Sequence, residues 1–504
     1  MKSKKIVGLM SLFSLLGLVA TSCGPTPGSS GSNPDSHPSE TGPVVPTEKP
    51  DEVDIIFWSA QGQKAINALK DVGRDFVDLV YKNEGVKVKL DISYQGDYDA
   101  VAKKISKGYA TGNTPTIAIA YPDNVAKFLL DEKNPGDFVV NLEKYMNNPD
   151  YGFGTDTYLG DQPNLDSKDF VSSFFEEGTK YYREGVYSLP YMKSSEVMFY
   201  NMTALTEVMA LYKPEFNSSR DLITEYIENV TWDEFMNLCG FIEQNKDKIT
   251  MPTYKYPAFY DSDANLFISK MFQNEIPYSS IDGEKGHIDY EEPANLTAAK
   301  EMVKELKAHY DDGKFTTKGI QGTYGSDSFK SGECIFTMGS TGGAGYNVPQ
   351  GDDFELGMCK VPVSNDNPYF VSQGPTLCML NSSILSATQN YWSTVYGWKF
   401  LKYITNPDIN VRLCMTGSEG YVPVRNSAYT NQIYINYLGS NDPLAKVANI
   451  VIREIGDSYL NTATFKGSAT LRVESGAILT NVFNGAKSID QAFTDAINNS
   501  KTKM

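Results

Sequence analysis

Residues 53–94 read VDIIFWSAQGQKAINALKDVGRDFVDLVYKNEGVKVKLDISY, and this stretch contains two kinds of hydrophobic periodicity. The run from Val53 to Trp58 is rich in β-branched and aromatic residues and is followed by turn-prone residues, which predicts a strand. From Val86 to Ile92, apolar and polar residues alternate with the period of a second strand. Between the two predicted strands, apolar residues recur with helical spacing at Ile66, Leu69, Val72, Phe76 and Leu79.

The following segment repeats this order of elements. Its pattern predicts a helix from Tyr98 to Tyr109 and an apolar strand from Thr116 to Ala120. The βαβαβ alternation implies a mostly parallel sheet with helices on its faces, so the expected fold class is α/β. In such sheets the loops after the carboxyl ends of the strands line the ligand crevice. Trp58, the segment 96–98 and Tyr121 lie at such ends.

Three later segments also read as helices. Thr231 to Glu234 has the form of a capping box, which predicts that a helix begins there. The segments from Trp392 to Tyr403 and from Ser488 to Ile497 are amphipathic with helical spacing. The chain shows no internal repeat, so a solenoid or repeat architecture is not expected.

Composition limits the classes of function. A chain of 504 residues is long enough for two lobes of ordinary size. Its formal charge of −17 repels phosphate backbones, so nucleic acid is not an expected partner. With 3 His and no C-x-x-C pair among 6 Cys, neither a metal site nor a cofactor is expected. We expect most of the five cysteines after Cys23 to be small buried hydrophobic residues.

The N-terminus has the features of an export signal. Three lysines precede an apolar run from Ile6 to Ala20, which is too short for a comfortable membrane span. The run ends in Ala20 to Gly24, which resembles a bacterial lipobox with Cys23 as the lipidated residue. An ordinary signal peptide with a nearby cysteine is the alternative. The tract that follows, to about Pro50, is rich in Pro, Gly and Ser and predicts a disordered tether.

Six short motifs occur together in one order along the chain. They are Ile56 to Ser59, Gln95 to Tyr98, Ala110 to Pro115, Leu189 to Asn201, Phe329 to Cys334 and Gly420 to Val424. In this collinear arrangement the chain resembles the extracellular solute-binding proteins of ABC importers, in the branch that includes the glycerol-3-phosphate-binding and maltodextrin-binding proteins.

The resemblance implies a two-lobed, periplasmic-binding-protein-like (type II) fold whose lobes close around a small ligand by a hinge. It places chain crossings near Lys193 to Val197, Phe336 to Ser340 and Ser382 to Ser386. The domains expected on this basis are a lipoprotein signal peptide (1–22), a tether (23–51), a first lobe (52–194 plus 338–383) and a second lobe (195–337 plus 384–504).

Residue chemistry and the resemblance together give a set of candidate ligand-binding residues. Aromatic rings suit the apolar faces of sugars, and hydroxyl and backbone N–H groups suit their oxygens. Core packing, a plain turn and helix capping remain the structural alternatives for these residues. The set is Trp58, Tyr98, Tyr121, Asp123, Ser194, Ser195, Ser340, Thr341, Gly374 and Tyr421.

The expected function is that of a receptor without catalytic residues. The arginine of the glycerol-3-phosphate receptor has no aligned counterpart near Lys466, and Arg472 does not align with it, which favours a sugar or oligosaccharide over glycerol-3-phosphate or a glycerophosphodiester. The expected partners are the solute, the permease subunits of an ABC importer and, through the lipid anchor, the outer face of the cell membrane, with the protein itself a monomer. A surface adhesin lipoprotein and a secreted glycan hydrolase remain alternatives.

Overall fold

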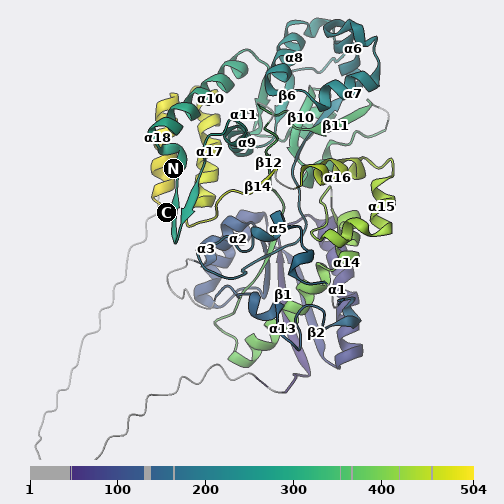
Figure 1. Ribbon diagram of the computed structural model, residues 1–504, viewed down its shortest axis with the longest axis vertical. Coiled ribbons are helices and arrows are strands. Elements are labelled where there is room, and N and C mark those ends of the chain that lie inside the picture. Colours follow the sequence, from purple (N-terminus) through teal and green to yellow (C-terminus); the bar gives the residue numbers. More distant parts are fainter. Residues whose placement is uncertain are drawn as a thin grey trace, which may run out of the picture. The chain divides into compact units, whose positions relative to one another are not determined.

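The elements predicted at the start of the chain are all present in the computed structural model (Figure 1). The structure describes residues 46, 48–129, 138–162, 165–351, 353–364, 367–418, 420–455 and 458–504. The predicted signal peptide, Cys23 and most of the predicted tether lie outside these residues. The first elements are β1 (Glu52–Ser59), α1 (Gln63–Glu84), β2 (Lys87–Tyr94), α2 (Tyr98–Gly108) and β3 (Ile117–Ala120).

These strands belong to a first sheet with the order β2-β1-β3-β13-β4. The strand β1 pairs in parallel with β2 and β3, as predicted, whereas β13 (Thr376–Met379) runs antiparallel to β3 and to β4 (Leu189–Pro190). The helix α13 (Ala387–Ile404) packs against β1, and its Phe400 contacts the rings of Phe57 and Phe76. Aromatic packing thus attaches a late helix to the first strand of the chain.

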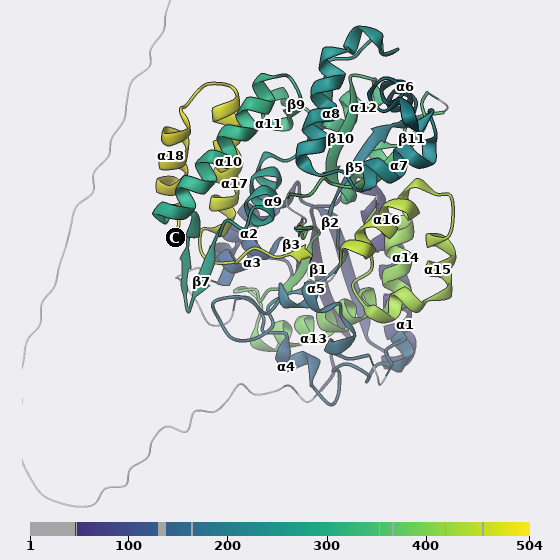
Figure 2. The same cartoon turned by 45° about the horizontal axis from the view of Figure 1, so that its top comes forward.

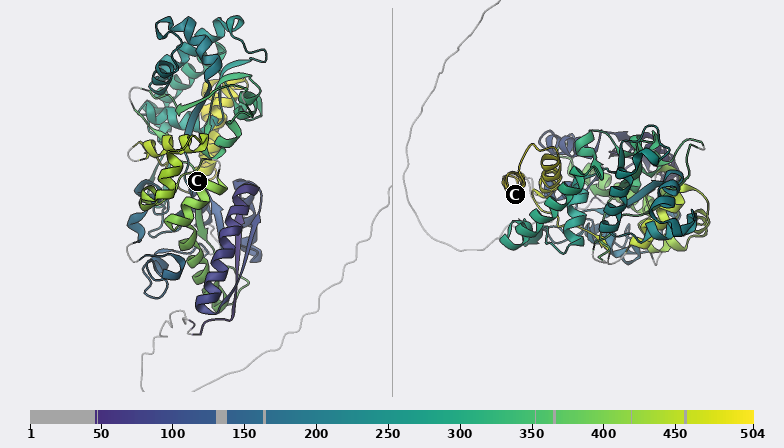
Figure 3. Two further views of the ribbon diagram at one scale, coloured as in Figure 1. Left: turned by 90° about the vertical axis from the view of Figure 1, so that its right-hand side faces the viewer. Right: turned by 90° about the horizontal axis from the view of Figure 1, so that it is seen from above.

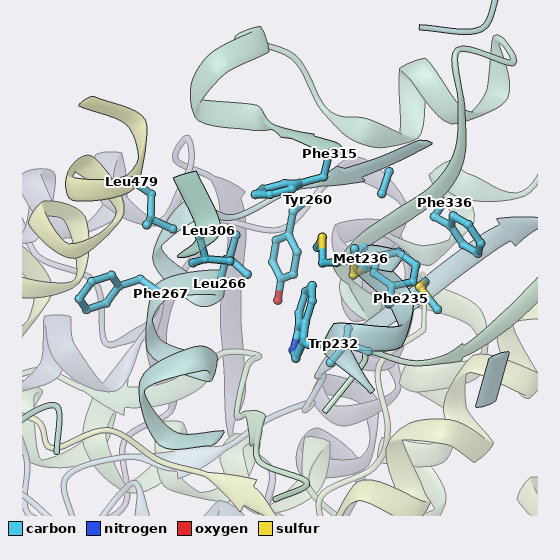
Figure 4. Packing of buried hydrophobic residues seen from close by; sticks show 14 of the residues in the cluster. Trp232, Phe235, Met236, Tyr260, Leu266, Phe267, Leu306, Phe315, Phe336 and Leu479 are labelled. Carbon is cyan, nitrogen blue, oxygen red and sulfur yellow. The ribbon is translucent and has the colours of Figure 1, made fainter. Parts of the chain in front are cut away.

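A second sheet has the order β11-β5-β10-β6-β9. Its central strand β10 (Cys334–Ser340) is antiparallel to β5 (Glu196–Asn201) and parallel to β6 (Tyr256–Tyr260), and β11 (Leu356–Lys360) and β9 (Phe315–Thr317) form the edges. The helix α8 (Trp232–Gln244) begins at the predicted capping box and places Trp232 and Phe235 against this sheet (Figure 4).

A group of four helices packs together in the part of the chain that holds the second sheet. The helices α9 (Asp263–Gln273), α10, α17 (Ser468–Phe483) and α18 lie side by side in the part of the chain that holds the second sheet (Figures 2 and 3). The other bounds are α3 (Pro122–Leu129), α4 (Glu143–Met146), α5 (Ser172–Glu176), α6 (Met202–Tyr212), α7 (Arg220–Glu228), α10 (Pro293–Asp311), α11 (Lys318–Gln321), α12 (Gly325–Lys330), α14 (Pro407–Gly417), α15 (Gln432–Leu438), α16 (Pro443–Glu454), α18 (Ile489–Lys501), β7 (Ser280–Asp282) and β8 (Lys285–His287).

Three segments that pair with one another are called here the crossing segments: residues 191–195, 367–375 and 458–467. The first two lie between strands of different sheets, and the third lies between α16, which packs on β5 and β11, and α17. Within them, β12 (Phe370–Val371) and β14 (Tyr459–Leu460) pair in parallel. The Ser194 amide donates to the Gln373 carbonyl at 3.0 Å, and the Tyr459 hydroxyl donates to the Ser194 carbonyl. The crossing segments therefore run side by side and are hydrogen-bonded to one another.

The predicted division into lobes is still a prediction, because residues Pro46–Met504 form one compact unit. The first crossing lies where it was predicted, whereas the two later predicted crossings do not lie between strands of different sheets. The predicted crossing at Phe336 to Ser340 is the fully paired central strand of the second sheet. The predicted crossing at Ser382 to Ser386 lies between β13 and α13, which both pack in the first sheet layer. The helix α14, which was predicted to belong to the second lobe, packs on α1 of the first sheet layer. The apolar face of α14 completes the core of that layer.

The cysteines agree with one further expectation. The cysteines at 239, 334, 359, 378 and 414 are buried and unpaired, as predicted for small hydrophobic residues. Within the described ranges, no helix has the length and apolar character needed to cross a membrane.

Candidate functional site

A cavity of about 650 Å³ lies beside the crossing segments and is lined from both sheet layers. One part of its wall comes from the end of β3, the start of α3 and the segment after α5. Another comes from α9, the segment around β7, and α17. The crossing segments contribute Lys193, residues 371–374 and residues 460–464.

The crossing-segment wall contains a buried ion pair. The Lys193 Nζ lies 2.6 Å from a carboxylate oxygen of Glu177, and their side chains are 1% and 7% exposed. The same ammonium donates to the Gly374 carbonyl at 3.3 Å, and the Ser372 hydroxyl donates to the other Glu177 oxygen. This network ties the segment after α5 to two of the crossing segments, so it fixes their relative positions.

The opposite wall joins α3 to α17. The Ser468 hydroxyl, at the first position of α17, donates to the Asp123 carboxylate at 2.5 Å. Burial raises the pKa of Asp123, while the Ser468 hydroxyl and the Arg472 charge oppose the rise. One turn further along α17, Arg472 donates from Nη2 to the Asn265 side-chain oxygen. The cavity therefore has a carboxyl group and a guanidinium on one wall.

Three lining side chains have buried polar atoms without a hydrogen-bond partner among the described residues. They are the Ser279 hydroxyl, the Gln373 amide nitrogen and the Asn461 amide oxygen. A buried polar atom without a partner costs roughly 1–3 kcal/mol, so native structures satisfy such atoms with water or ligand. These two donors and one acceptor can contact the hydroxyl groups of a solute.

Of the residues predicted from the sequence, Tyr121, Asp123 and Gly374 line the cavity. Tyr98 is next to them, because its ring lies 4.2 Å from that of Tyr121, measured between centroids. Tyr421 lies beside Tyr98, and burial raises the pKa of both hydroxyls, which stay protonated as donors. The structure thus brings four of the predicted aromatic and acidic residues, with Gly374, into one region.

The other predicted residues lie behind this region, and none is among the described residues that line the cavity. Trp58 is 8% exposed and packs in the core. The Ser340 hydroxyl accepts from the Gly342 amide at 3.2 Å, which fits the turn alternative. The Thr341 hydroxyl oxygen accepts from the Ser195 amide at 3.3 Å. These roles in packing and turn formation do not require a ligand.

Ser194 and Ser195 belong to the first crossing segment, and their buried hydroxyls lack partners within the described structure. Glu454, at the end of α16, is 4% exposed, and both of its carboxyl oxygens are likewise unpartnered among described residues. Burial raises the pKa of Glu454 to about 8, although the nearby Ser195 hydroxyl opposes the rise. The end of α16, next to Ser195 of the first crossing segment, thus carries a carboxyl group that is largely protonated at neutral pH.

Sequence reasoning missed Glu177, Lys193, Gln373, Asn461 and Arg472 as cavity residues. Gln373 adjoins the predicted Gly374, and Lys193 begins the predicted first crossing, so both had a local signal. For Glu177 and Asn461, the sequence carries no pattern that distinguishes them from surface residues.

Gly374 is required by the close approach of two crossing segments. Its φ is +98°, and an added Cβ would lie 2.4 Å from the Met192 carbonyl oxygen and 2.8 Å from the Lys193 Cα. Both neighbours are backbone atoms and cannot rotate away. We expect Gly374→Ala to lower the free energy of unfolding by about 2–4 kcal/mol, since positive φ and overpacking each cost about 1–3 kcal/mol. Urea denaturation measures this, and Gly351→Ala, at positive φ with open space, is the matched control.

Residues 80–440 match a protein family described as bacterial extracellular solute-binding proteins. None of the curated proteins compared matches the chain.

Several solved structures share the fold. UgpB from Mycobacterium tuberculosis, in complex with glycerophosphocholine, has a TM-score of 0.64 and 18% identity over 89% of this chain and 98% of its own. The GacH receptor of Streptomyces glaucescens has a TM-score of 0.61 and 16% identity, covering 89% and 97% of the two chains. Maltose-bound MalE3 from T. maritima has a TM-score of 0.61 and 14% identity, covering 90% and 100%.

Proposed function

The chain belongs to the bacterial extracellular solute-binding proteins, and on that premise we propose that it captures a small solute in the cavity beside the crossing segments and delivers it to the permease of an ABC importer. The observation that carries this proposal is the cavity of about 650 Å³, a usual size for small-molecule sites. It is lined from both sheet layers, so a bound solute bridges them.

The crossing segments supply a mechanism for capture. Two of these segments lie between strands of different sheets, and all three are paired with one another, as expected for a hinge. The Asp123–Ser468 hydrogen bond closes the wall between α3 and α17. A solute that contacts both layers favours this closed arrangement, because it binds that form better than any other.

The proposed solute is rich in hydroxyl groups, with a sugar or oligosaccharide as the first class. The Tyr121 ring is 37% exposed and can pack on the apolar face of a sugar. Ser279, Gln373 and Asn461 offer polar atoms without partners among described residues, matched to hydroxyl groups. A glycerol-phosphate compound is the second class. Among the structural neighbours, MalE3 is bound to maltose and UgpB to glycerophosphocholine.

We propose a binding function without catalysis. The two carboxylates of the described lining, Asp123 and Glu177, are engaged by Ser468 and by Lys193 with Ser372, so neither is free as a general acid or base. The remaining parts of the proposal are that Cys23 anchors the chain to the outer face of the cell membrane and that the protein acts as a monomer.

Thermal unfolding with a panel of solutes tests the proposal. We expect the full chain carrying Cys23→Ala, which cannot be lipidated, to unfold several degrees higher with its solute. A ligand at 100 times its dissociation constant adds about 2.7 kcal/mol to stability. The panel contains maltose, maltotetraose, glycerol-3-phosphate and glycerophosphocholine.

The variant Gln373→Ala tests whether the same cavity is responsible. It should weaken binding of the active solute about tenfold, which is the effect of losing one hydrogen bond. If no solute raises the unfolding temperature, the receptor function is contradicted and a surface adhesin becomes the better explanation.

A further inference from the structure

Arg472 is held at the cavity wall by the contacts of its own helix. It follows Ser468 by one turn of α17, so both side chains project from the same face. The Ser468 hydroxyl bond to Asp123 fixes this face against α3, and the Asn265 side-chain oxygen accepts from the Arg472 guanidinium. The position of the guanidinium is therefore set before any solute arrives.

This guanidinium has no carboxylate within ion-pair distance among the described residues. The other cations of the lining differ, because Lys193 pairs with Glu177 and Lys180 with Glu176. Arg472 is thus the lining cation for which the described chain supplies no counter-charge.

The two carboxyl groups that sense the Arg472 charge do not replace a counter-ion. Asp123 accepts from Ser468, and Glu196 accepts from the Tyr260 hydroxyl at 2.6 Å and from the Asn265 amide at 2.8 Å. Burial raises the pKa of both carboxyl groups, that of Glu196 to about 7. Both carboxyl groups already accept hydrogen bonds from other donors, so neither forms an ion pair with Arg472.

A second donor lines the same cavity as Arg472. Tyr278 is near enough for the Arg472 charge to lower its pKa, against a larger rise caused by burial, and the Tyr278 hydroxyl is 3.2 Å from Ser475, one turn beyond Arg472 on α17. The next residue, Ser279, lines the cavity with a hydroxyl that has no partner among described residues. Arg472 and Ser279 thus line the same cavity, and a guanidinium together with a hydroxyl donor suits an oxyanion.

We propose that Arg472 makes the cavity selective for a solute that carries one anionic group, a phosphate ester or a carboxylate, on a hydroxyl-rich body. This inference rests on the proposed function and names its substrate class. The anionic group contacts Arg472 and Ser279, while Gln373 and Asn461 contact the hydroxyl-rich part.

Calorimetric titration of the full chain carrying Cys23→Ala tests this. The anionic probes are glycerophosphoglycerol and a glucuronate-containing disaccharide, which distinguish a phosphate from a carboxylate, and maltose is the neutral probe. We expect one anionic probe to bind at least about tenfold more tightly than maltose. Arg472→Gln should then weaken it about 10- to 100-fold, the loss expected for hydrogen bonds to a charged group.

Two variants and a salt series control for indirect effects. Arg472→Lys keeps the charge but not the fork of donors, and should bind between the wild type and Arg472→Gln. Arg412→Gln removes an exposed arginine that lies outside the described cavity lining and pairs with Asp75, and should change affinity less than about threefold. Binding of the anionic probe should weaken with added salt.

The outcomes separate this inference from the proposed function. If maltose binds and neither anionic probe does, or if Arg472→Gln leaves the affinity for the anionic probe unchanged, the anion site is contradicted while the receptor function stands. If no probe binds to folded protein, both are contradicted.

Discussion

The Lys193→Met variant should lose about 3–5 kcal/mol of its free energy of unfolding at neutral pH. Lys193 and Glu177 are almost fully buried, and removing one partner of a buried ion pair leaves the other charge without compensation. The Ser372 hydroxyl remains as a donor to Glu177, which keeps the loss near the lower end of this range. Urea denaturation followed by circular dichroism measures the change.

Two matched variants make this prediction specific. The double variant Lys193→Met/Glu177→Gln removes both charges and should recover most of the loss, since a neutral pair of similar volume needs no counter-charge. Lys255→Met breaks an exposed pair with Glu333 and should cost at most about 1 kcal/mol. A loss for Lys193→Met as small as that for Lys255→Met would show that water reaches the pair, and hence that the crossing segments are open in solution.

The Glu454→Gln variant should be more stable than the wild type at alkaline pH. Burial raises the pKa of Glu454 from 4.5 to about 8, so the folded chain keeps a proton that the unfolded chain has released. Between these values stability falls as pH rises, by about 1.4 kcal/mol per unit for a single group. The stabilising effect of this proton is complete below pH about 4.5 and is lost as the pH rises through about 8.

Urea denaturation at pH 5 and pH 8 tests the sign of this pH dependence of stability. Wild type and Glu454→Gln should differ little at pH 5, and at pH 8 the variant should be more stable by about 2–3 kcal/mol, because relaxation and hydration reduce the full linkage value. Glu196 titrates in both proteins and does not affect the difference. Glu225→Gln, on the exposed face of α7, is the control and should show no such dependence. Equal stability of Glu454→Gln and wild type at pH 8 would mean that the Glu454 carboxyl is hydrated.

Lys193 belongs to a crossing segment that borders the cavity, and Glu454 ends the helix α16 next to that segment. Lys193 lines the cavity directly, whereas Glu454 lies behind it, next to Ser195. The Lys193→Met variant should therefore have a changed affinity for the solute, because the substitution alters the cavity wall. The Glu454→Gln variant should retain the solute contacts.

Elements with a regular pattern over many residues could be predicted from the sequence. The strand, helix and strand that open the chain lie where their periodicity placed them, and α8 begins at the capping box of Thr231. Such features depend on neighbours within a few residues, so the local sequence is sufficient. The family also follows from short collinear motifs, and the match over residues 80–440 confirms it.

The assignment of late elements to a sheet layer could not be predicted in this way. The helix α13 is amphipathic in either layer, and it packs on β1 because Phe400 completes an aromatic cluster with Phe57 and Phe76. Phe400 is more than three hundred positions from Phe57 and Phe76, and no local pattern connects it to them. The same reason explains why β10 is a central strand and not a crossing.

For the site, the sequence by itself determined the kinds of residue available and the strand ends that carry Tyr98, Tyr121 and Asp123. Only the tertiary structure decided that Glu177, Asn461 and Arg472 line the same cavity, and that Trp58, Ser340 and Thr341 do not. The physical reason is that strand and helix formation depend on contacts close in sequence. A cavity between two layers forms where distant segments meet, and its charge balance depends on which side chains find partners there.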